Sequence, residues 1–210
     1  MKNKNSVIVF DFDGTIADTM SHIKDIMNDL SQKFNFKKID ENNLEELRGK
    51  RTQEVFKAIG VPLVKIPIVL KRVRTIFTQK IKDFKPIKGI KETLIQLNEK
   101  GFQLGIITSS PLNNVNKFLK NNNLDLFDFI YSERNIFQKD RKMLRLLKKK
   151  KLEPNQVFYV GDETRDIEAA RKAGVKTVAV TWGFNNEAVL RGYKPDFLVK
   201  QPKDLTKIFT

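Results

Sequence analysis

The stretch VIVFDFDGTIADT, residues 7–19, runs four apolar residues directly into two aspartates that are separated by one residue. The run VIVF is short, apolar throughout and rich in β-branched side chains, which indicates a strand buried on both faces. Folding alone gives no reason to place Asp11 and Asp13 there, because neighbouring carboxylates repel each other. Either the two aspartates form a polar turn after the strand, or a cation lies between them.

Further strand-like runs follow, and they alternate with longer helical patterns. Together the runs are SVIVFD (6–11), QLGIIT (103–108), DFIYS (128–132), QVFYVGD (156–162) and KTVAVTW (176–182). Most of them are apolar on both faces, which is typical of a parallel sheet that is covered by helices. The alternation predicts an α/β fold class with an open, Rossmann-like parallel sheet.

The first connection is much longer than a crossover between parallel strands requires. About ninety residues separate the first strand from the run at 103–108, whereas a crossover needs about a dozen. Apolar residues at helical spacing predict helices at about 20–34, 40–47, 52–59 and 68–82. We therefore predict an α-helical insert over residues 17–85, which divides an α/β core made of residues 1–16 and 86–210.

Polar side chains gather at the predicted carboxyl ends of the strands, where open α/β sheets bind their ligands. These residues are Asp11, Asp13, Thr15, Thr108, Ser109, Ser110, Lys139, Asp162 and Asp166. Chance can place one polar residue after a strand, but it rarely brings several carboxylates, a hydroxyl and a lysine to one edge. The pattern predicts a catalytic site at this edge of the sheet.

The motifs DFDGT (11–15) and GDETRD (161–166), with Thr108 and Lys139 between them, resemble the four motifs of the haloacid dehalogenase-like hydrolase superfamily. The insert after the first strand is similar to the helical cap of the phosphoglycolate-phosphatase-like branch. The resemblance implies a Mg²⁺-dependent phosphatase that hydrolyses a small phosphomonoester, with phosphoglycolate as the nearest named substrate. The motif around Lys139 reads FQKDRK, so Lys142 is a competing candidate one helical turn further on.

The chemistry of phosphate esters favours the cation over the polar turn. An anionic nucleophile attacks an anionic ester only after charge is neutralised, and Mg²⁺ with oxygen ligands neutralises it. Asp11 and Asp162 are the expected carboxylate ligands, and the resemblance adds the backbone carbonyl of Asp13. Asp11 is then the nucleophile that forms an aspartyl-phosphate. Asp13 is expected to protonate the leaving group and afterwards to activate water.

The remaining residues of the predicted site bind phosphate or orient the catalytic groups. Thr108 is expected to donate a hydrogen bond to a phosphoryl oxygen, and Ser109 to assist through its backbone N–H. Lys139 is expected to stabilise the nucleophile and the charge of the transferring group. Asp166 either orients the outer ligand shell of the metal or pairs with Lys139.

The stretch LRGKRT, residues 47–52, is the candidate for a loop of the insert that faces the substrate. Gly49 can bend it, and Arg48, Lys50 and Arg51 can pair with anions. The alternative is an ordinary solvated loop between two helices.

Charge and composition limit the remaining function classes. The net charge is +15, which makes nucleic acid the first partner to consider, although no nucleic-acid-binding motif supports that partner. The chain contains no cysteine, which excludes disulfides and thiolate metal sites. No apolar run approaches the ~20 residues of a membrane span, so we expect no membrane partner and a cytoplasmic setting.

Three alternatives stay open at this point. The leading prediction is a phosphatase that acts on a small anionic phosphorylated substrate, as a monomer or a dimer. A sugar-phosphate mutase would carry the same motifs but would interconvert sugar phosphates without net release of phosphate. A nucleic-acid-binding protein would use the basic surface and would survive loss of the Asp11 carboxylate.

Overall fold

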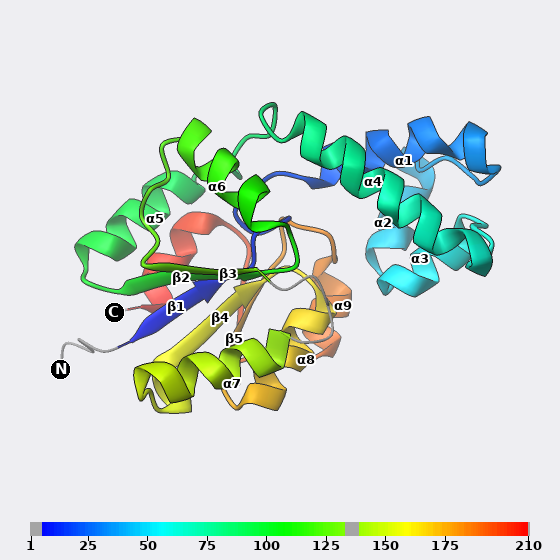
Figure 1. Cartoon of the computed structure of the whole chain (residues 1–210). Coiled ribbons are helices and arrows are strands. Elements are labelled where there is room, and N and C mark those ends of the chain that lie inside the picture. Colours follow the sequence, from blue (N-terminus) through cyan, green and yellow to red (C-terminus); the bar gives the residue numbers. More distant parts are fainter. Residues whose placement is uncertain (1–5, 133–138, 210) are drawn as a thin grey trace.

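The strands form one parallel sheet in the order β3-β2-β1-β4-β5-β6 within the described residues, 6–132 and 139–209, of this computed structural model (Figure 1). Their bounds are β1 Val7–Phe10, β2 Gln103–Thr108, β3 Phe129–Ser132, β4 Val157–Gly161, β5 Lys176–Val180 and β6 Phe197–Val199. The predicted α/β fold class is confirmed. The order places β1 at the centre, with β2 and β4 as its neighbours.

Helices cover both faces of the sheet, as the apolar strands predicted. Ile8 and Phe10 of β1 belong to a core on one face, and Val7 and Val9 belong to a separate core on the other. Figure 1 shows α5 and α6 above the sheet and α7 and α8 below it. Their bounds are α5 Ile90–Glu99, α6 Leu112–Asn121, α7 Lys139–Lys150 and α8 Thr164–Ala173. Because β1 has no solvent-facing side, its polar residues can lie only beyond its end.

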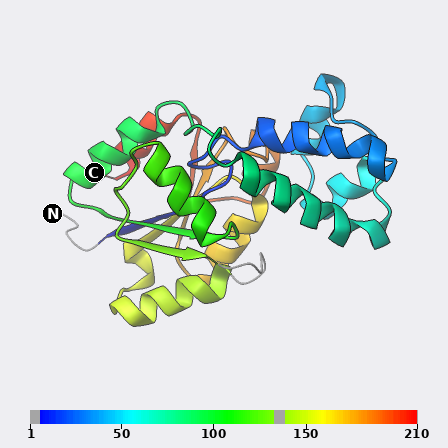
Figure 2. The same ribbon diagram turned by 45° about the horizontal axis from the view of Figure 1, so that its top comes forward.

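The long first connection contains α5 and, before it, four α-helices that stand to one side of the sheet in both views (Figures 1 and 2). They are α1 Met20–Phe34, α2 Glu41–Arg48, α3 Thr52–Ala58 and α4 Ile66–Lys80, with a short 3₁₀ helix at Leu63–Lys65. The predicted helices agree with these to within about two residues, the usual scatter of helix ends. Helix α4 begins two residues earlier than expected, because Pro67 is well tolerated in a first turn.

The four helices, which we call the helical insert, share an apolar cluster of their own. Met27, Phe56 and Val69 are among its buried members, and each comes from a different helix of the insert. The chain enters and leaves the insert side by side, because Ala17 forms a β-bridge with Pro86. These contacts agree with an independent unit, although the division at residues 17–85 stays a prediction.

One strand was not predicted. Strand β6 is only three residues long and pairs with β5 at the edge of the sheet, so its pattern is too short to recognise. A 3₁₀ helix at Pro154–Gln156 precedes β4, and α9 at Glu187–Gly192 lies between β5 and β6. After β6 come a short 3₁₀ helix at Pro202–Asp204 and α10 at Leu205–Ile208. Within the described residues, every helix is too short or too polar to cross a membrane.

Candidate active site

The central strands deliver three of the predicted site residues to one edge of the sheet. Asp11 directly follows β1, Asp162 directly follows β4, and Thr108 is the last residue of β2. Since these strands are parallel neighbours, their carboxyl ends lie next to one another. Residues that are far apart in the sequence therefore form one site, as the motif pattern predicted.

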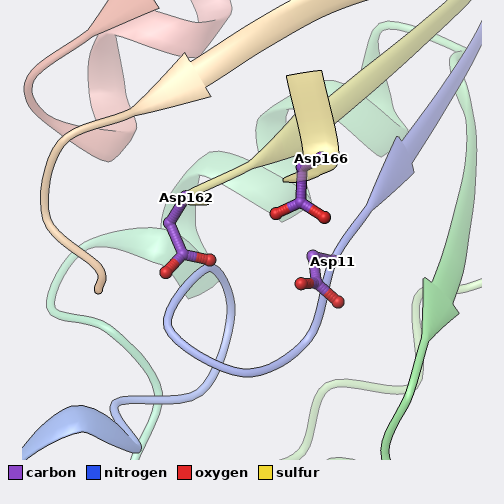
Figure 3. A group of neighbouring side chains, drawn as sticks. All are labelled: Asp11, Asp162 and Asp166. Carbon is purple, nitrogen blue, oxygen red and sulfur yellow. The ribbon is translucent and has the colours of Figure 1, made fainter. Parts of the chain in front are cut away.

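A buried cluster of carboxylates forms the centre of this site. Oxygen atoms of Asp11, Asp162 and Asp166 all lie within 4.8 Å of one another. Figure 3 shows the three side chains facing each other, from the ends of β1 and β4 and from the first turn of α8. Their exposed fractions are 2%, 0% and 1%. Buried carboxylates this close together need a cation or a proton among them.

Lys139 supplies one such cation. Its Nζ donates hydrogen bonds to Asp11 Oδ2 at 2.7 Å and to Asp166 Oδ1 at 2.6 Å. The lysine is 1% exposed and is the first residue of α7. Of the two roles expected for Asp166, the structure thus shows the pairing with Lys139.

Asp162 is enclosed by backbone that only glycine permits. Its Oδ1 accepts a hydrogen bond from Thr15 Oγ1 at 2.7 Å, and its Oδ2 accepts one from the Phe184 backbone N–H at 2.7 Å. A Cβ atom at Gly14 would lie 2.3 Å from Asp162 Oδ2, and one at Gly183 would lie 2.1 Å from the same atom. Gly14 also has a φ of +74°, so its close approach serves the Asp162 carboxylate.

Asp13 lies beside the cluster and is held by a serine. Ser110 Oγ donates to Asp13 Oδ2 at 2.6 Å, and the Ser110 backbone N–H donates to Thr108 Oγ1 at 3.0 Å. The other carboxylate oxygen, Asp13 Oδ1, is buried and has no hydrogen-bond partner within the described part of the chain. This oxygen is therefore available to a ligand or a proton.

The electrostatics of the site favour protons or a metal ion on its carboxylates. Burial raises the pKa of Asp11 to about 7 and that of Asp13 to about 6, although nearby Lys139 opposes both shifts. Burial and neighbouring carboxylates also raise the pKa of Asp162 well above its ordinary value. Burial is the largest cause of all three shifts, and neighbouring carboxylates add to it at Asp11 and Asp162.

The donor set fits a hard divalent cation. Asp11, Asp162 and Asp166 offer only oxygen atoms, which Mg²⁺ and similar ions prefer. A divalent cation would offset the repulsion among these carboxylates. The carboxylate of Asp13 is not part of this group, which leaves its backbone carbonyl as the predicted ligand.

Comparison with known families agrees with this geometry. Residues 8–180 match the family described as haloacid dehalogenase-like hydrolase, and they include both aspartate motifs and the lysine. The chain belongs to this family. The resemblance seen in the motifs is confirmed.

Two curated relatives cover almost the whole hydrolase. A phosphoglycolate phosphatase of Synechococcus elongatus is 34% identical over 204 residues, which are 97% of this chain and 96% of the relative. Pyrophosphatase PpaX of Bacillus mycoides is 28% identical over 217 residues, 99% of this chain and 98% of the relative. A solved haloacid dehalogenase-like hydrolase from Streptococcus pneumoniae superposes with a TM-score of 0.84 at 24% identity, and covers 99% of both chains.

The loop after α2 fastens the helical insert to the core of the hydrolase. Arg48 Nη2 donates to the carbonyls of Thr181 at 3.2 Å and Gly183 at 3.1 Å, and Arg48 Nη1 bonds Glu45 at 2.6 Å. The Asn185 side chain donates to the carbonyl of Arg48 at 2.9 Å. Nη2 of Arg48 therefore holds the insert to the core and Nη1 pairs within the insert, while the buried Nε has no hydrogen-bond partner among the described residues. The predicted contact of Arg48 with the substrate stays a prediction.

Replacement of Arg48 by alanine is expected to loosen this attachment. The loss of charged donors to two carbonyls should lower the free energy of unfolding by roughly 1–3 kcal/mol. Amide hydrogen exchange should become faster in α2, the helix that Arg48 ends. The matched control is Arg72→Ala, at an exposed position of α4. Unchanged exchange in α2 would show that Arg48 does not secure the insert.

A pocket of about 340 Å³ lies between the insert and the strand ends of the hydrolase. Asp13, Ser109 and Arg165 line it from the core, and Arg48 and Lys50 line it from the insert. Lys50 also forms an ion pair with Glu46 at 3.1 Å. Two predicted residues of the core, Asp13 and Ser109, thus meet two predicted residues of the insert around one cavity, whereas Asp11, Thr108, Lys139 and Asp162 do not line it.

Two residues of the site were not assigned a role from the sequence. Ser110 was noted only as the end of a strand, yet it holds Asp13. Arg165 lies between the aspartates of GDETRD, pairs with Glu163 and lines the pocket. Its buried Nε has no partner within the described residues. The serines that follow β2 in the sequence could have indicated a role for Ser110. The direction in which the Arg165 side chain points depends on where α8 lies in the fold.

Proposed function

We propose that this hydrolase is a Mg²⁺-dependent phosphatase that cleaves a small phosphomonoester through an aspartyl-phosphate on Asp11. The observation that carries the proposal is the buried contact of Asp11 with Lys139 beside Asp162, with Asp13 adjacent and facing a pocket. The relative named phosphoglycolate phosphatase supports the same reaction class. Phosphoglycolate is accordingly the first substrate to test.

Asp11 and Asp162 would hold the Mg²⁺ with their carboxylates, and Asp13 would hold it with its backbone carbonyl. Asp166 would act from the outer ligand shell and through Lys139. When bound, Mg²⁺ neutralises charge on the phosphoryl oxygens and orients them.

In the first step, a carboxylate oxygen of Asp11 attacks phosphorus, and the bond from phosphorus to the ester oxygen breaks. Asp13 gives its proton to that oxygen, so the leaving group departs as an alcohol. The raised pKa of Asp13, about 6, keeps a fraction of this carboxyl protonated close to neutral pH. Its unpaired Oδ1 provides a place for the proton.

In the second step, water attacks the phosphorus of the aspartyl-phosphate, and Asp13 accepts the proton of that water. Phosphate leaves, and the Asp11 carboxylate is restored. Thr108 and the Ser109 backbone N–H would bind phosphoryl oxygens, and Lys139 would balance the charge on Asp11. The Thr108 hydroxyl only accepts in its bond from Ser110, so its proton remains for the substrate.

The helical insert, residues 17–85, would act as a cap that covers the leaving group and keeps bulk water from the reaction. The pocket between insert and core supports this role. Arg48 and Lys50 would face the substrate at the pocket wall.

The experiment that tests the proposal is release of inorganic phosphate from phosphoglycolate, sugar phosphates and nucleotides, with Mg²⁺ and with a chelator. We expect release that the chelator abolishes. Interconversion of a sugar phosphate without release would indicate a mutase instead. Tight binding of oligonucleotides that weakens steeply with salt would indicate the nucleic-acid partner.

The affinity for Mg²⁺ is expected to fall as the pH falls. Burial raises the pKa of Asp11 to about 7, so protons compete with the metal for this carboxylate below that pH. The loss should approach about tenfold per pH unit on the acid side. Calorimetric titration with Mg²⁺ at several pH values measures it. An affinity that stays constant between about pH 8 and about pH 5 would contradict Asp11 as a ligand.

A further inference from the structure

The pocket that Asp13 lines is mainly apolar on the side of the insert. Half-buried apolar side chains from all four helices line it, namely Met20, Ile23, Leu44, Val55, Leu70 and Val73. Fully buried members of the insert cluster, among them Met27 and Phe56, complete the wall. The core contributes mainly polar side chains, among them Asp13 and Ser109, and the insert adds the polar side chains of Lys24, Arg48, Lys50, Thr52 and Arg74.

The packing of the insert alone does not require apolar side chains on the wall of the pocket. The six half-buried side chains keep accessible surface on a cavity of about 340 Å³, and apolar surface in contact with water is unfavourable. Pockets that bind small organic ligands span about 300–1,000 Å³ and are lined mostly by apolar side chains with a few polar groups. The cavity has this size, and its wall on the side of the insert is mostly apolar.

Three of the four cations of the insert that line the pocket already have acidic partners, and Arg74 on α4 is the fourth. Of those that line the pocket, Lys24 pairs with Glu41 at 3.0 Å, Arg48 with Glu45 at 2.6 Å and Lys50 with Glu46 at 3.1 Å. A carboxylate such as that of glycolate would compete with these acidic partners. An uncharged apolar group would leave all three pairs intact.

We propose that the substrate is a phosphomonoester of an apolar alcohol with several carbon atoms, and that its hydrocarbon part occupies this pocket. The inference rests on the proposed phosphatase function and specifies its substrate class. The phosphoryl group lies at Asp11, the ester oxygen beside Asp13, and the hydrocarbon against α1, α3 and α4. Glycolate, with two carbons and a charge, would leave most of the apolar wall in contact with water.

The test is a series of n-alkyl phosphates, from ethyl through butyl to hexyl, compared with phosphoglycolate. These alcohols have nearly equal pKa values, so differences report binding of the chain. We expect kcat/KM to rise about fourfold for each added methylene, from burial of about 0.8 kcal/mol per group. Hexyl phosphate should therefore exceed ethyl phosphate by well over tenfold. Equal values along the series, or higher kcat/KM for phosphoglycolate than for hexyl phosphate, would overturn the inference.

Variants of the pocket wall test whether the expected rise of kcat/KM with chain length arises in this pocket. Leu70→Gln and Val55→Gln, on α4 and α3, should each lower the hexyl-to-ethyl ratio of kcat/KM at least about fivefold, since a polar group then faces the chain. Ile68→Gln is the matched control, because Ile68 lies on the same helix as Leu70 but is 54% exposed and outside the pocket. Its ratio should equal that of the unmodified protein. Two positions are used so that misfolding of one variant does not decide the result.

Binding without turnover separates this inference from the proposed function. Hexyl and ethyl phosphate are titrated by calorimetry into the Asp11→Asn protein, which keeps the pocket. Stronger binding of hexyl phosphate supports the apolar pocket, and equal binding overturns it. If the unmodified protein releases phosphate from every ester at the same rate, the phosphatase function stands and the inference fails. If it releases none, the phosphatase function fails, and the substrate class proposed on it fails as well.

Discussion

Turnover by the Asp11→Asn protein is expected to be at least about 10⁴-fold lower than that of the unmodified protein, as for removal of a covalent nucleophile. The amide is a poor nucleophile and a poor metal ligand, so both proposed roles of Asp11 are lost. Phosphate release at saturating Mg²⁺ measures the effect.

The fold of this variant should be retained. Burial raises the pKa of Asp11 to about 7, so the protein disfavours the charged form and tolerates a neutral side chain of the same shape. Lys139 keeps its second partner, Asp166. Asp18→Asn is the matched control, because Asp18 lies in the same loop but is exposed. Near-normal turnover by the Asp11→Asn protein would contradict the proposed mechanism.

Replacement of Lys139 by methionine should remove both activity and much of the stability. The change leaves the buried carboxylates of Asp11 and Asp166 without their common cation. Loss of one partner from a buried ion pair costs roughly 3–5 kcal/mol. Loss of electrostatic stabilisation in the reaction should lower kcat by about 10²–10³-fold. Denaturant unfolding and phosphate release measure the two effects.

The stability defect of this variant should depend on pH with a defined sign. Without Lys139, the folded protein binds a proton on Asp11 more tightly than the unfolded chain does, because burial raises the pKa of Asp11. The folded state of the variant is then disfavoured progressively as the pH rises above about 4. The defect should be smaller in acid than at neutral pH. Lys142→Met is the matched control, and if it abolishes activity while Lys139→Met does not, the lysine has been assigned to the wrong position.

The sequence was sufficient for the fold class and for the central residues of the site. Buried strands produce apolar runs that are visible in the chain, and parallel strands bring their ends together. The meeting of Asp11, Asp162 and Lys139 therefore follows from topology. Strand β6 was missed because an edge strand of three residues has no recognisable period.

Other features depend on distances that the sequence does not encode locally. Arg48 was expected to face an anion, but its guanidinium reaches carbonyls more than a hundred residues away. The bond from Ser110 to Asp13 spans the gap between β1 and β2. The apolar pocket depends on how the insert lies on the core, and amphipathic spacing shows only that each helix has an apolar face.

The bridge between Ala17 and Pro86 has a consequence for how fast the chain folds. From an unstructured chain, pairing of β1 with β2 would close a loop of about ninety residues, which slows folding. The apolar cluster of the insert, however, contains only residues from 23 to 73, so these helices can form from local contacts. Once they have formed, their ends lie side by side at the bridge. Pairing of β1 with β2 then closes only a short loop, because the two segments have already been brought close together.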